Sequence, residues 1–584
     1  MKFLRNLLAV IVGLFIFSLF SLFVMIGVVS SLATMEEKVE VRPNSVLRLD
    51  LNRAIVERAL DDPFAELGFV HGVKKPLGVL DITRAIKYAK TDDNIKGIYL
   101  DCGMISAGYA SLLEIRKALL DFKDSGKFIV SYSEMFTDPG YYLASVADEV
   151  MVAQESIFFE FNGISSNTVF LKGLLDKLGI EPEIYRVGDY KGAVEPFMRK
   201  DLSPENEFQI KSFISSIYQS IIRDIAASRR ISVDSLDEIA SEMKVFSAED
   251  ALKFKLVDRM GYYDQVDANL KERLDLGEAD KVEFSDIEKY IKAAQPASST
   301  LNRIAVVIAA GEIVSGSGDH TMVGSEEFVK ALQEVRDDEN VKAVVLRINS
   351  PGGSGMASDV IWREIMLTKE KKPVIASMSD LAASGGYYIA MGCDTIVTNP
   401  TTITGSIGVF GLMFNIQKFL NDKLGITTDV VSTGKHSDIF NMTRPHTPEE
   451  KAMIQNMVEK FYKAFVDKAA EGRNMPVEKI MEIASGRVWT GEQAVQIGLA
   501  DMTGDFDTAL EIAAQKAGVD DYKIRYYPKR KTFLEQLFEG LTTEVELRIA
   551  KKSLGEEYYF LKKLNEVKNW TGIQARMPYD ITIR

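Results

Sequence analysis

A serine followed by two glycines stands at Ser384, in the stretch LAASGGYY of residues 381–388. The residues after it have a helix-like pattern, which predicts that the serine lies at a helix N-terminus. The first backbone N–H groups of a helix lack intrahelical partners, and the helix dipole is positive there. This position suits a nucleophile that becomes an alkoxide. It also suits a simple N-cap, which is a common role of serine, so this stretch alone leaves both interpretations open.

A second glycine-rich loop, NSPGGSG at residues 349–355, precedes the serine in the chain. Glycine lets a backbone approach a substrate closely, and backbone N–H groups are common donors to the oxyanion of acyl transfer. The candidate donors are the N–H of Gly385, directly after the serine, and an N–H of Gly352 or Gly353. A tight turn is the alternative interpretation of this loop.

A serine nucleophile needs a general base, and this sequence offers few histidines. They are His71, His320, His436 and His446, and none stands in a recognisable triad pattern with Ser384. His436 is nevertheless kept as an alternative base. A lysine can take this role only when it is neutral, so burial must lower its pKa by roughly 3 units from about 10.4.

An internal repeat at an offset of 246 residues organises the chain. Gly140-Tyr141-Tyr142 recurs at 386–388, and DKLGI at 176–180 recurs at 422–426. Helix-like and strand-like segments alternate in both copies, which is typical of βαβ units. The sequence therefore predicts an α/β protein built by tandem duplication.

Four parts are predicted along the chain. Residues 1–36 form a cytoplasmic N-terminus and transmembrane anchor, 37–295 the first unit, 300–525 the second unit, and 526–584 a helical tail for packing or assembly. Residues 295–300 read as a polar linker of small residues between the units.

The two units carry complementary residues. Ser384 falls opposite Asp138, and the loop at 349–353 falls opposite GMISA, which lacks the double glycine. Lys191, in the turn-rich stretch YRVGDYKGAVEP, falls opposite Ser437. A single composite site where the units meet explains this pattern. The alternative is independent drift, with Lys191 an ordinary solvated lysine.

A third polar candidate is Ser406, in the stretch TGSIG at 404–408. The surrounding glycines indicate close backbone contact. Its hydroxyl could hold the lysine amine by a hydrogen bond, or it could belong to a turn, and the sequence leaves both open.

The N-terminal run of residues 6–35 is uncharged and largely apolar. It exceeds the roughly 20 residues that span a bilayer and the central region of a cleaved signal. Lys2 and Arg5 precede it and acidic residues follow it, so the positive-inside rule places the start in the cytoplasm and the rest outside. An uncleaved anchor is predicted, with signal-peptide cleavage at 31–33 as the alternative.

Composition narrows the function classes further. A net charge of −14 without a basic stripe argues against nucleic acid as a partner. Cys102 and Cys393 are too few for a disulfide framework or a zinc site and are expected to be buried thiols. Neither a cofactor nor a metal ion is expected, and a nucleotide-binding P-loop pattern is absent from the sequence.

Four stretches together resemble a known family. They are RINSPGGS at 347–354, ASGGYY at 383–388, TGSIG at 404–408 and YRVGDYKGAVEP at 185–196. With them the chain is similar to the long, tandem-duplicated form of the signal peptide peptidase A family, and the similarity covers nearly its whole length. The resemblance implies two ClpP/crotonase-like (ββα-spiral) domains after one N-terminal transmembrane helix.

The resemblance also implies a role for each site residue. Ser384 would be the nucleophile and Lys191 the general base, Ser406 would assist the lysine, and Gly353 and Gly385 would form the oxyanion hole. The implied enzyme is a homotetramer anchored in the bilayer of the bacterial inner membrane, with its bulk in the periplasm. It would degrade cleaved signal peptides and other apolar peptides without ATP.

Two other functions remain as alternatives. A crotonase-type acyl-CoA enzyme would share the fold and the oxyanion loops, but the predicted anchor and the pairing of serine with lysine argue against it. A membrane scaffold derived from a decayed peptidase is the second alternative. The second unit argues against it because it keeps its serine and its glycine loops together.

Overall fold

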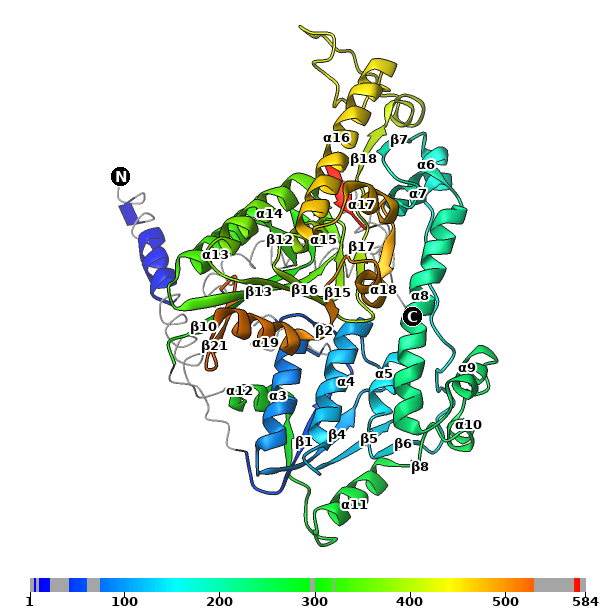
Figure 1. Ribbon diagram of the computed structural model, residues 1–584, viewed down its shortest axis with the longest axis vertical. Helices are drawn as coiled ribbons and strands as arrows, with labels where there is room; N and C mark the ends of the chain where they lie inside the picture. Colours follow the sequence, from blue (N-terminus) through cyan, green and yellow to red (C-terminus); the bar gives the residue numbers. More distant parts are fainter. Residues whose placement is uncertain are drawn as a thin grey trace.

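The computed structural model describes residues 5–6, 10–21, 41–59, 74–294, 300–318, 321–529 and 572–577. Two parallel β-sheets, one from each unit, lie one above the other with helices over their faces (Figure 1). The structure is thus the mixed α/β protein that the alternating pattern predicts.

The first unit is built on a sheet of order β8-β6-β5-β4-β1-β9, in which every neighbouring pair is parallel. Its strands are β1 (Ser45–Asp50), β4 (Ile95–Asp101), β5 (Phe128–Ser133), β6 (Glu149–Ala153), β8 (Arg259–Gly261) and β9 (Phe284–Asp286). The short strands β2 (Ile55–Val56) and β3 (Leu77–Gly78) form a separate parallel pair.

The second unit repeats this strand order. β20, β16, β15, β13, β10 and β21 pair in sequence in parallel fashion, in the places of β8, β6, β5, β4, β1 and β9. Their bounds are β10 (Arg303–Ala310), β13 (Val341–Ser350), β15 (Val374–Ala383), β16 (Thr395–Thr398), β20 (Met502–Thr503) and β21 (Lys523–Tyr527). The shared order agrees with the tandem duplication. β17 (Ile403–Gly405) pairs in parallel with the end of β15, and β19 (Val488–Thr490) pairs antiparallel with β17.

A third sheet, of order β12-β11-β14-β22-β18-β7, draws strands from both units and from the tail. Its strands are β7 (Glu181–Arg186), β11 (Glu312–Val314), β12 (Met322–Gly324), β14 (Gly352–Ser354), β18 (Phe410–Asn415) and β22 (Ile573–Arg576). Most of the predicted helical tail lies outside the described residues. Of the part that the structure describes, residues 526–527 complete strand β21 and residues 573–576 form strand β22.

The helices of the two units pack around the three sheets (Figure 1). In the first unit they are α3 (Val79–Thr91), α4 (Tyr109–Lys123), α5 (Asp138–Ala144), α6 (Lys172–Leu178), η1 (Gly192–Val194), α7 (Glu195–Met198), α8 (Pro204–Arg229), α9 (Val233–Ser241), α10 (Ala248–Lys253), α11 (Tyr263–Arg273) and α12 (Ile287–Ala293). In the second unit they are α13 (Ser325–Asp337), α14 (Gly355–Lys369), α15 (Gly385–Ala390), η2 (Phe419–Leu424), α16 (Pro448–Arg473), α17 (Val477–Ile483), α18 (Gly491–Gln496) and α19 (Phe506–Ala517).

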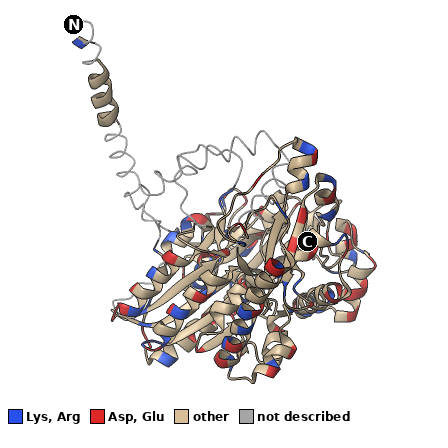
Figure 2. Ribbon diagram, turned by 90° about the horizontal axis from the view of Figure 1, so that it is seen from above, with Lys and Arg blue, Asp and Glu red and all other residues tan. Residues whose placement is uncertain are grey.

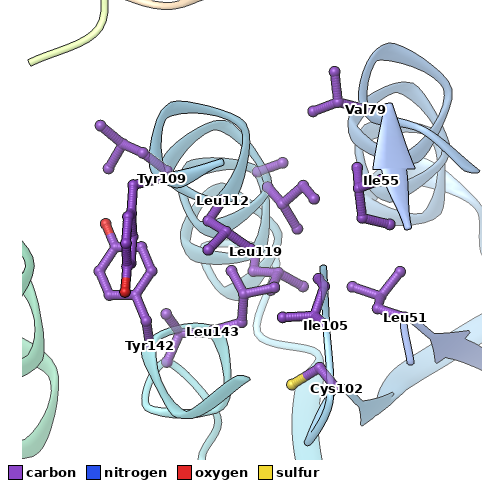
Figure 3. Close-up of a cluster of buried hydrophobic side chains, with 14 of the residues drawn as sticks. Leu51, Ile55, Val79, Cys102, Ile105, Tyr109, Leu112, Leu119, Tyr142 and Leu143 are labelled. Carbon is purple, nitrogen blue, oxygen red and sulfur yellow. The ribbon is translucent and has the colours of Figure 1, made fainter. Parts of the chain in front are cut away.

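The hydrophobic core continues from one unit into the other. A single buried cluster contains Leu112 of α4 together with Val345 of β13 and Phe506 of α19. Figure 3 shows its first-unit part, where Leu112 and Leu119 of α4 gather with Leu143 of α5. Because both units bury apolar surface against each other, the fold fixes their relative position. Both cysteines are buried and free, as predicted.

The long helix α8 also joins the units. Its 26 residues extend about 39 Å, and Figure 1 shows it running along the side of both sheets. The Ser203 side chain caps its first turn, which satisfies a backbone N–H that the helix leaves free. Its Gln209 accepts a hydrogen bond from the Val488 N–H at 3.0 Å. The N-terminal part of α8 is therefore held against the second unit.

The apolar N-terminal run is described only in part. Residues 10–21 form a helix without charged residues that lies apart from the main body (Figure 2). None of the helices in the described ranges has both the length and the apolar character needed to cross a bilayer. Residues 7–9 and 22–40 of the predicted anchor lie outside the described residues.

Candidate active site

Strand β7 of the first unit leads the chain to Lys191 and brings it next to the second unit. β7 pairs antiparallel with β18 of the second unit along six residue pairs. In the turn that follows, Gly188 has a φ of +98°, and a Cβ on it would stand 2.3 Å from the carbonyl oxygen of Ser485. Only glycine fits so close to that backbone. The N–H of Tyr190 donates to the same carbonyl at 3.1 Å, so the turn is anchored to the second unit directly before Lys191.

Ser384 stands between the end of β15 and the start of α15, in an uncommon backbone conformation. Its φ is +55° and its ψ is −109°, a region that residues with a Cβ rarely occupy. Its N–H donates to the carbonyl of Gly405 at 2.8 Å, and its own carbonyl accepts from the N–H of Tyr388 at 2.8 Å. The side chain makes no capping hydrogen bond to α15. The simple N-cap interpretation of this serine is therefore wrong.

The lysine amine and two serine hydroxyls meet in one buried cluster. Lys191 Nζ lies 2.8 Å from Ser384 Oγ, 3.0 Å from Ser406 Oγ and 3.2 Å from the Ser406 carbonyl oxygen. All three residues are 0% exposed. Residues from the two units thus come together within one chain, which the sequence alone left open. The interpretation of Lys191 as a solvated lysine is wrong.

Burial lowers the pKa of Lys191 well below its usual value. Desolvation disfavours the ammonium form of a buried lysine, and among the described residues no carboxylate offsets this effect. The glycines around the side chain make the enclosure tight, since a Cβ on Gly486 would stand 2.7 Å from the Cβ of Lys191. The neutral amine is the form that can accept a proton from a hydroxyl.

The glycine loop and the start of α15 lie side by side. Gly352 and Gly353 have φ values of +93° and +154°. A Cβ on Gly352 would stand 2.5 Å from the nitrogen of Gly385, and a Cβ on Gly353 would stand 2.1 Å from the carbonyl oxygen of Ile313. No larger residue fits at either position. The two stretches that the sequence proposes as oxyanion donors are therefore neighbours.

The described histidines have other partners. His436 Nδ1 lies 3.1 Å from a carboxylate oxygen of Glu450. His446 is buried, and its Nδ1 lies 2.9 Å from the hydroxyl of Tyr185. His71 and His320 lie outside the described residues. Among the described residues, the side chain that approaches the Ser384 hydroxyl is Lys191.

Arg347 has a structural role that the sequence analysis did not recognise. It is fully buried in β13, and its guanidinium donates to Glu57 and Glu114 of the first unit at 2.8 Å each. β13 ends at Ser350, two residues before Gly352 of the glycine-rich loop. These ion pairs fix the strand that carries the loop to the first unit. The only signal in the sequence is a charged residue inside the apolar stretch VKAVVLRINS.

Comparison with known families agrees with the duplicated fold. The family model described as "Peptidase family S49" matches the chain twice, over residues 121–277 and 366–520. The chain belongs to peptidase family S49.

Similar proteins cover most of the chain. "Protease 4" of Salmonella typhi is 36% identical over 480 residues, which are 80% of this chain and 76% of that protein. "Serine protease SPPA, chloroplastic" of Arabidopsis thaliana is 35% identical over 500 residues, 84% of this chain and 72% of that protein. "Protease 4" of Haemophilus influenzae is 32% identical over 485 residues, which are 80% of this chain and 78% of that protein. The chain is a serine peptidase of the long form found in these relatives.

Proposed function

We propose that this peptidase works through a Ser–Lys dyad, with Ser384 as nucleophile and Lys191 as general base. The observation that carries the proposal is the 2.8 Å contact between Lys191 Nζ and Ser384 Oγ in a fully buried setting. A serine hydroxyl attacks only when a base removes its proton. Burial lowers the pKa of Lys191 and so favours its neutral amine, the form that a general base requires.

Acylation and deacylation use the same two groups. The Ser384 oxygen bonds to the carbonyl carbon of the peptide while Lys191 takes its proton. The tetrahedral intermediate then collapses, the carbon–nitrogen bond breaks, and the lysine ammonium gives that proton to the leaving amine. Water next attacks the acyl ester, with Lys191 accepting its proton. The second tetrahedral intermediate then collapses, the bond between carbon and the serine oxygen breaks, and the lysine ammonium returns its proton to that oxygen as the carboxylic acid leaves.

The other site residues have supporting roles. The N–H groups of Gly353 and Gly385 would hold the oxyanion of the tetrahedral intermediate. The close approach of the glycine loop to Gly385 supports this role. Ser406 would orient the lysine amine through its hydroxyl at 3.0 Å and its carbonyl at 3.2 Å. An amine held by fixed acceptors points its lone pair at the serine rather than rotating freely.

We further propose the substrate and the location. The enzyme would degrade cleaved signal peptides and other apolar peptides, without ATP, as a homotetramer held by residues 1–36 in the bacterial inner membrane with its bulk in the periplasm. The apolar N-terminal run and the resemblance to the signal peptide peptidase A family support this proposal. The strand order shared by the two units supports a ClpP/crotonase-like fold for each of them.

A labelling experiment tests the dyad. A fluorophosphonate probe is expected to label the wild type on Ser384, to leave Ser384→Ala unlabelled, and to label Lys191→Ala much more slowly. Labelling of the wild type should rise with pH through an apparent pKa below the lysine reference of about 10.4. Equal labelling of Lys191→Ala and wild type would show that the base is another residue.

Substrate preference is tested separately, with purified full-length protein in detergent. Leucine-rich peptides are expected to be cleaved faster than charged peptides of equal length. Equal rates for the two peptide classes would contradict the preference for apolar substrates and leave the dyad untouched.

A further inference from the structure

Strand β22 of the C-terminal tail lies between two strands that border the active site. On one side it pairs antiparallel with β14, with Gly353 opposite Ala575. On its other side it pairs antiparallel with β18, with Phe410 opposite Gln574. β14 contains a proposed oxyanion glycine, and β18 pairs with β7, the strand that leads to Lys191. A tail segment thus fills the space between the elements that carry the two sides of the site.

The carbonyl oxygen of Ala575 lies close to Gly352 and Gly385. It lies 2.1 Å from the place where a Cβ on Gly352 would stand and 3.0 Å from the corresponding place on Gly385. These glycines lie directly beside the nucleophile, since Gly385 follows Ser384. A bound substrate of a serine peptidase likewise places a peptide carbonyl beside the oxyanion donors.

Specific contacts hold the segment at its C-terminal end. The N–H of Met577 donates to the carbonyl of Pro351 at 2.7 Å. Arg576 forms an ion pair with Glu312 of β11 at 2.6 Å, and both side chains are mostly buried. The Ala575 side chain is fully buried. The small side chain, the ion pair and the backbone pairing together define one position for the segment.

The space that β22 fills has the form of a binding slot for an extended peptide. In the described structure, β14 pairs with β11 on one side and β18 pairs with β7 on one side, and β22 alone separates them. Paired strands lie about 4.8 Å apart, so the slot is one strand wide. Without β22, both strands would present free edges, which is the arrangement that captures a peptide by strand addition.

We propose that residues 572–577 are an internal substrate mimic that occupies the peptide-binding cleft and must leave before a substrate peptide enters. This inference rests on the proposed function of Ser384 and Lys191. A substrate would take the same place as an extended strand, with a small residue where Ala575 lies. The tail therefore competes with substrate, and its affinity for the cleft sets the fraction of enzyme that is open.

Charge reversal of the ion pair in the full-length protein tests the proposal. Arg576→Glu and Glu312→Arg should each release the segment, and the double variant should restore the pair and hold it again. If the segment occupies the cleft for nine-tenths of the time, either single change should raise kcat/KM for a short peptide ester, and the rate of fluorophosphonate labelling, by about tenfold. The double variant should return to the wild-type rates.

A synthetic peptide provides the matched control. The peptide TGIQARMP, which copies residues 571–578, should inhibit Arg576→Glu competitively, whereas a scrambled peptide should not. Against the double variant that carries both Glu312→Arg and Arg576→Glu, the peptide TGIQAEMP should inhibit better than TGIQARMP. This exchange of preference distinguishes docking in the cleft from a general effect of charge.

Three results would overturn the proposal in different ways. If the single variants match the wild type and the peptide does not compete, the segment does not occupy the cleft. If the single variants lose activity and the double variant is not rescued, β22 is a permanent part of the fold. If no variant is labelled on Ser384, the proposed function itself fails, and the inference fails with it.

Discussion

The two units place different chemistry at the start of corresponding short helices. In the first unit, Thr137 precedes α5 with an ordinary φ of −92°, and its side chain accepts a hydrogen bond from the N–H of Gly140. In the second unit, Ser384 precedes α15 with a φ of +55° and makes no such bond. Asp138, the repeat counterpart of Ser384, is the first residue of α5 and not part of a strained turn.

This difference shows where the second unit gives up local stability. A capped helix with ordinary backbone angles satisfies every local preference. The serine in the second unit forgoes the cap, so its hydroxyl is free to meet Lys191. Strain of this kind persists where the surrounding structure enforces it, and it is common at functional sites. The first unit shares the fold and supplies Lys191, the proposed base, and its corresponding helix start has ordinary backbone angles.

Removing the serine hydroxyl should have the largest effect. We expect Ser384→Ala to lower kcat/KM for a peptide ester by about 10⁴-fold or more, because the nucleophile is lost. Asp138→Asn, at the corresponding position of the first unit, should leave the rate within about twofold of wild type, an effect of under 0.5 kcal/mol. Steady-state kinetics of the two variants measure the contrast. Comparable losses in both would break the asymmetry between the units.

Removing the amine should come next. Lys191→Ala should lower kcat/KM by about 10²- to 10⁴-fold, the range expected for a general base. The residue opposite it in the repeat is Ser437, an exposed side chain that bonds to the carbonyl of Gly434, so Ser437→Ala should be neutral. The pH–rate profile of the wild type should rise as the amine loses its proton. A flat profile would contradict a lysine base.

The ion pairs between the units should matter for stability. Arg347→Ala leaves the buried carboxylates of Glu57 and Glu114 without their cation and should lower the free energy of unfolding by about 3–5 kcal/mol. Urea unfolding followed by fluorescence measures it. Asp101, the counterpart of Arg347 in the first unit, is only partly buried, and Asp101→Asn should cost about 1 kcal/mol. Equal costs would mean that the pairs do not join the units.

The hydroxyl that holds the amine should have a smaller effect on the rate. Ser406→Ala removes one hydrogen bond to Lys191 Nζ and leaves the contact with the Ser406 carbonyl. One such bond contributes about 1–1.5 kcal/mol, so kcat/KM should fall about tenfold. Ser406→Thr keeps the hydroxyl and should recover part of the loss. Full activity of Ser406→Ala would place this serine outside the mechanism.

Stability should depend on pH in opposite ways at two groups of the first unit, Asp138 and Lys191. Burial raises the pKa of Asp138 to about 8, so the folded state binds more protons than the unfolded state and stability falls as pH rises from about 4 to 8. Burial lowers the pKa of Lys191, so stability rises with pH from that lowered value up to about 10.4. Thermal unfolding should show that Asp138→Asn removes the first slope and Lys191→Met the second. Unchanged slopes would contradict these assignments.

The sequence predicted those parts of the structure that depend on short-range pattern or on the repeat. The alternation of helix-like and strand-like segments predicted the mixed α/β architecture that the structure shows. The repeat singled out Lys191 and Ser384, whose atoms the structure brings within 2.8 Å. Their catalytic roles stay predictions.

Pairing between strands or charges far apart in the chain could not be predicted from the sequence. β22 contains the unremarkable stretch IQAR, and its partners on β14 and β18 lie more than 160 residues away in the chain. The partners of Arg347 lie 290 and 233 residues from it. No periodicity records which distant edge a short strand joins or which buried charge meets another, because those choices depend on packing of the whole chain.

The distance in sequence between the proposed base, Lys191, and the proposed nucleophile, Ser384, has a consequence for synthesis. Ser384 follows Lys191 by 193 residues, which a ribosome adds in roughly 10–40 s at about 5–20 residues per second. During that interval the growing chain contains Lys191 but not yet Ser384, and β7 has no β18 with which to pair. On the proposed mechanism, a nascent chain therefore has no proteolytic activity until its second unit has been made and folded, and neighbouring polypeptides are not cleaved during that interval.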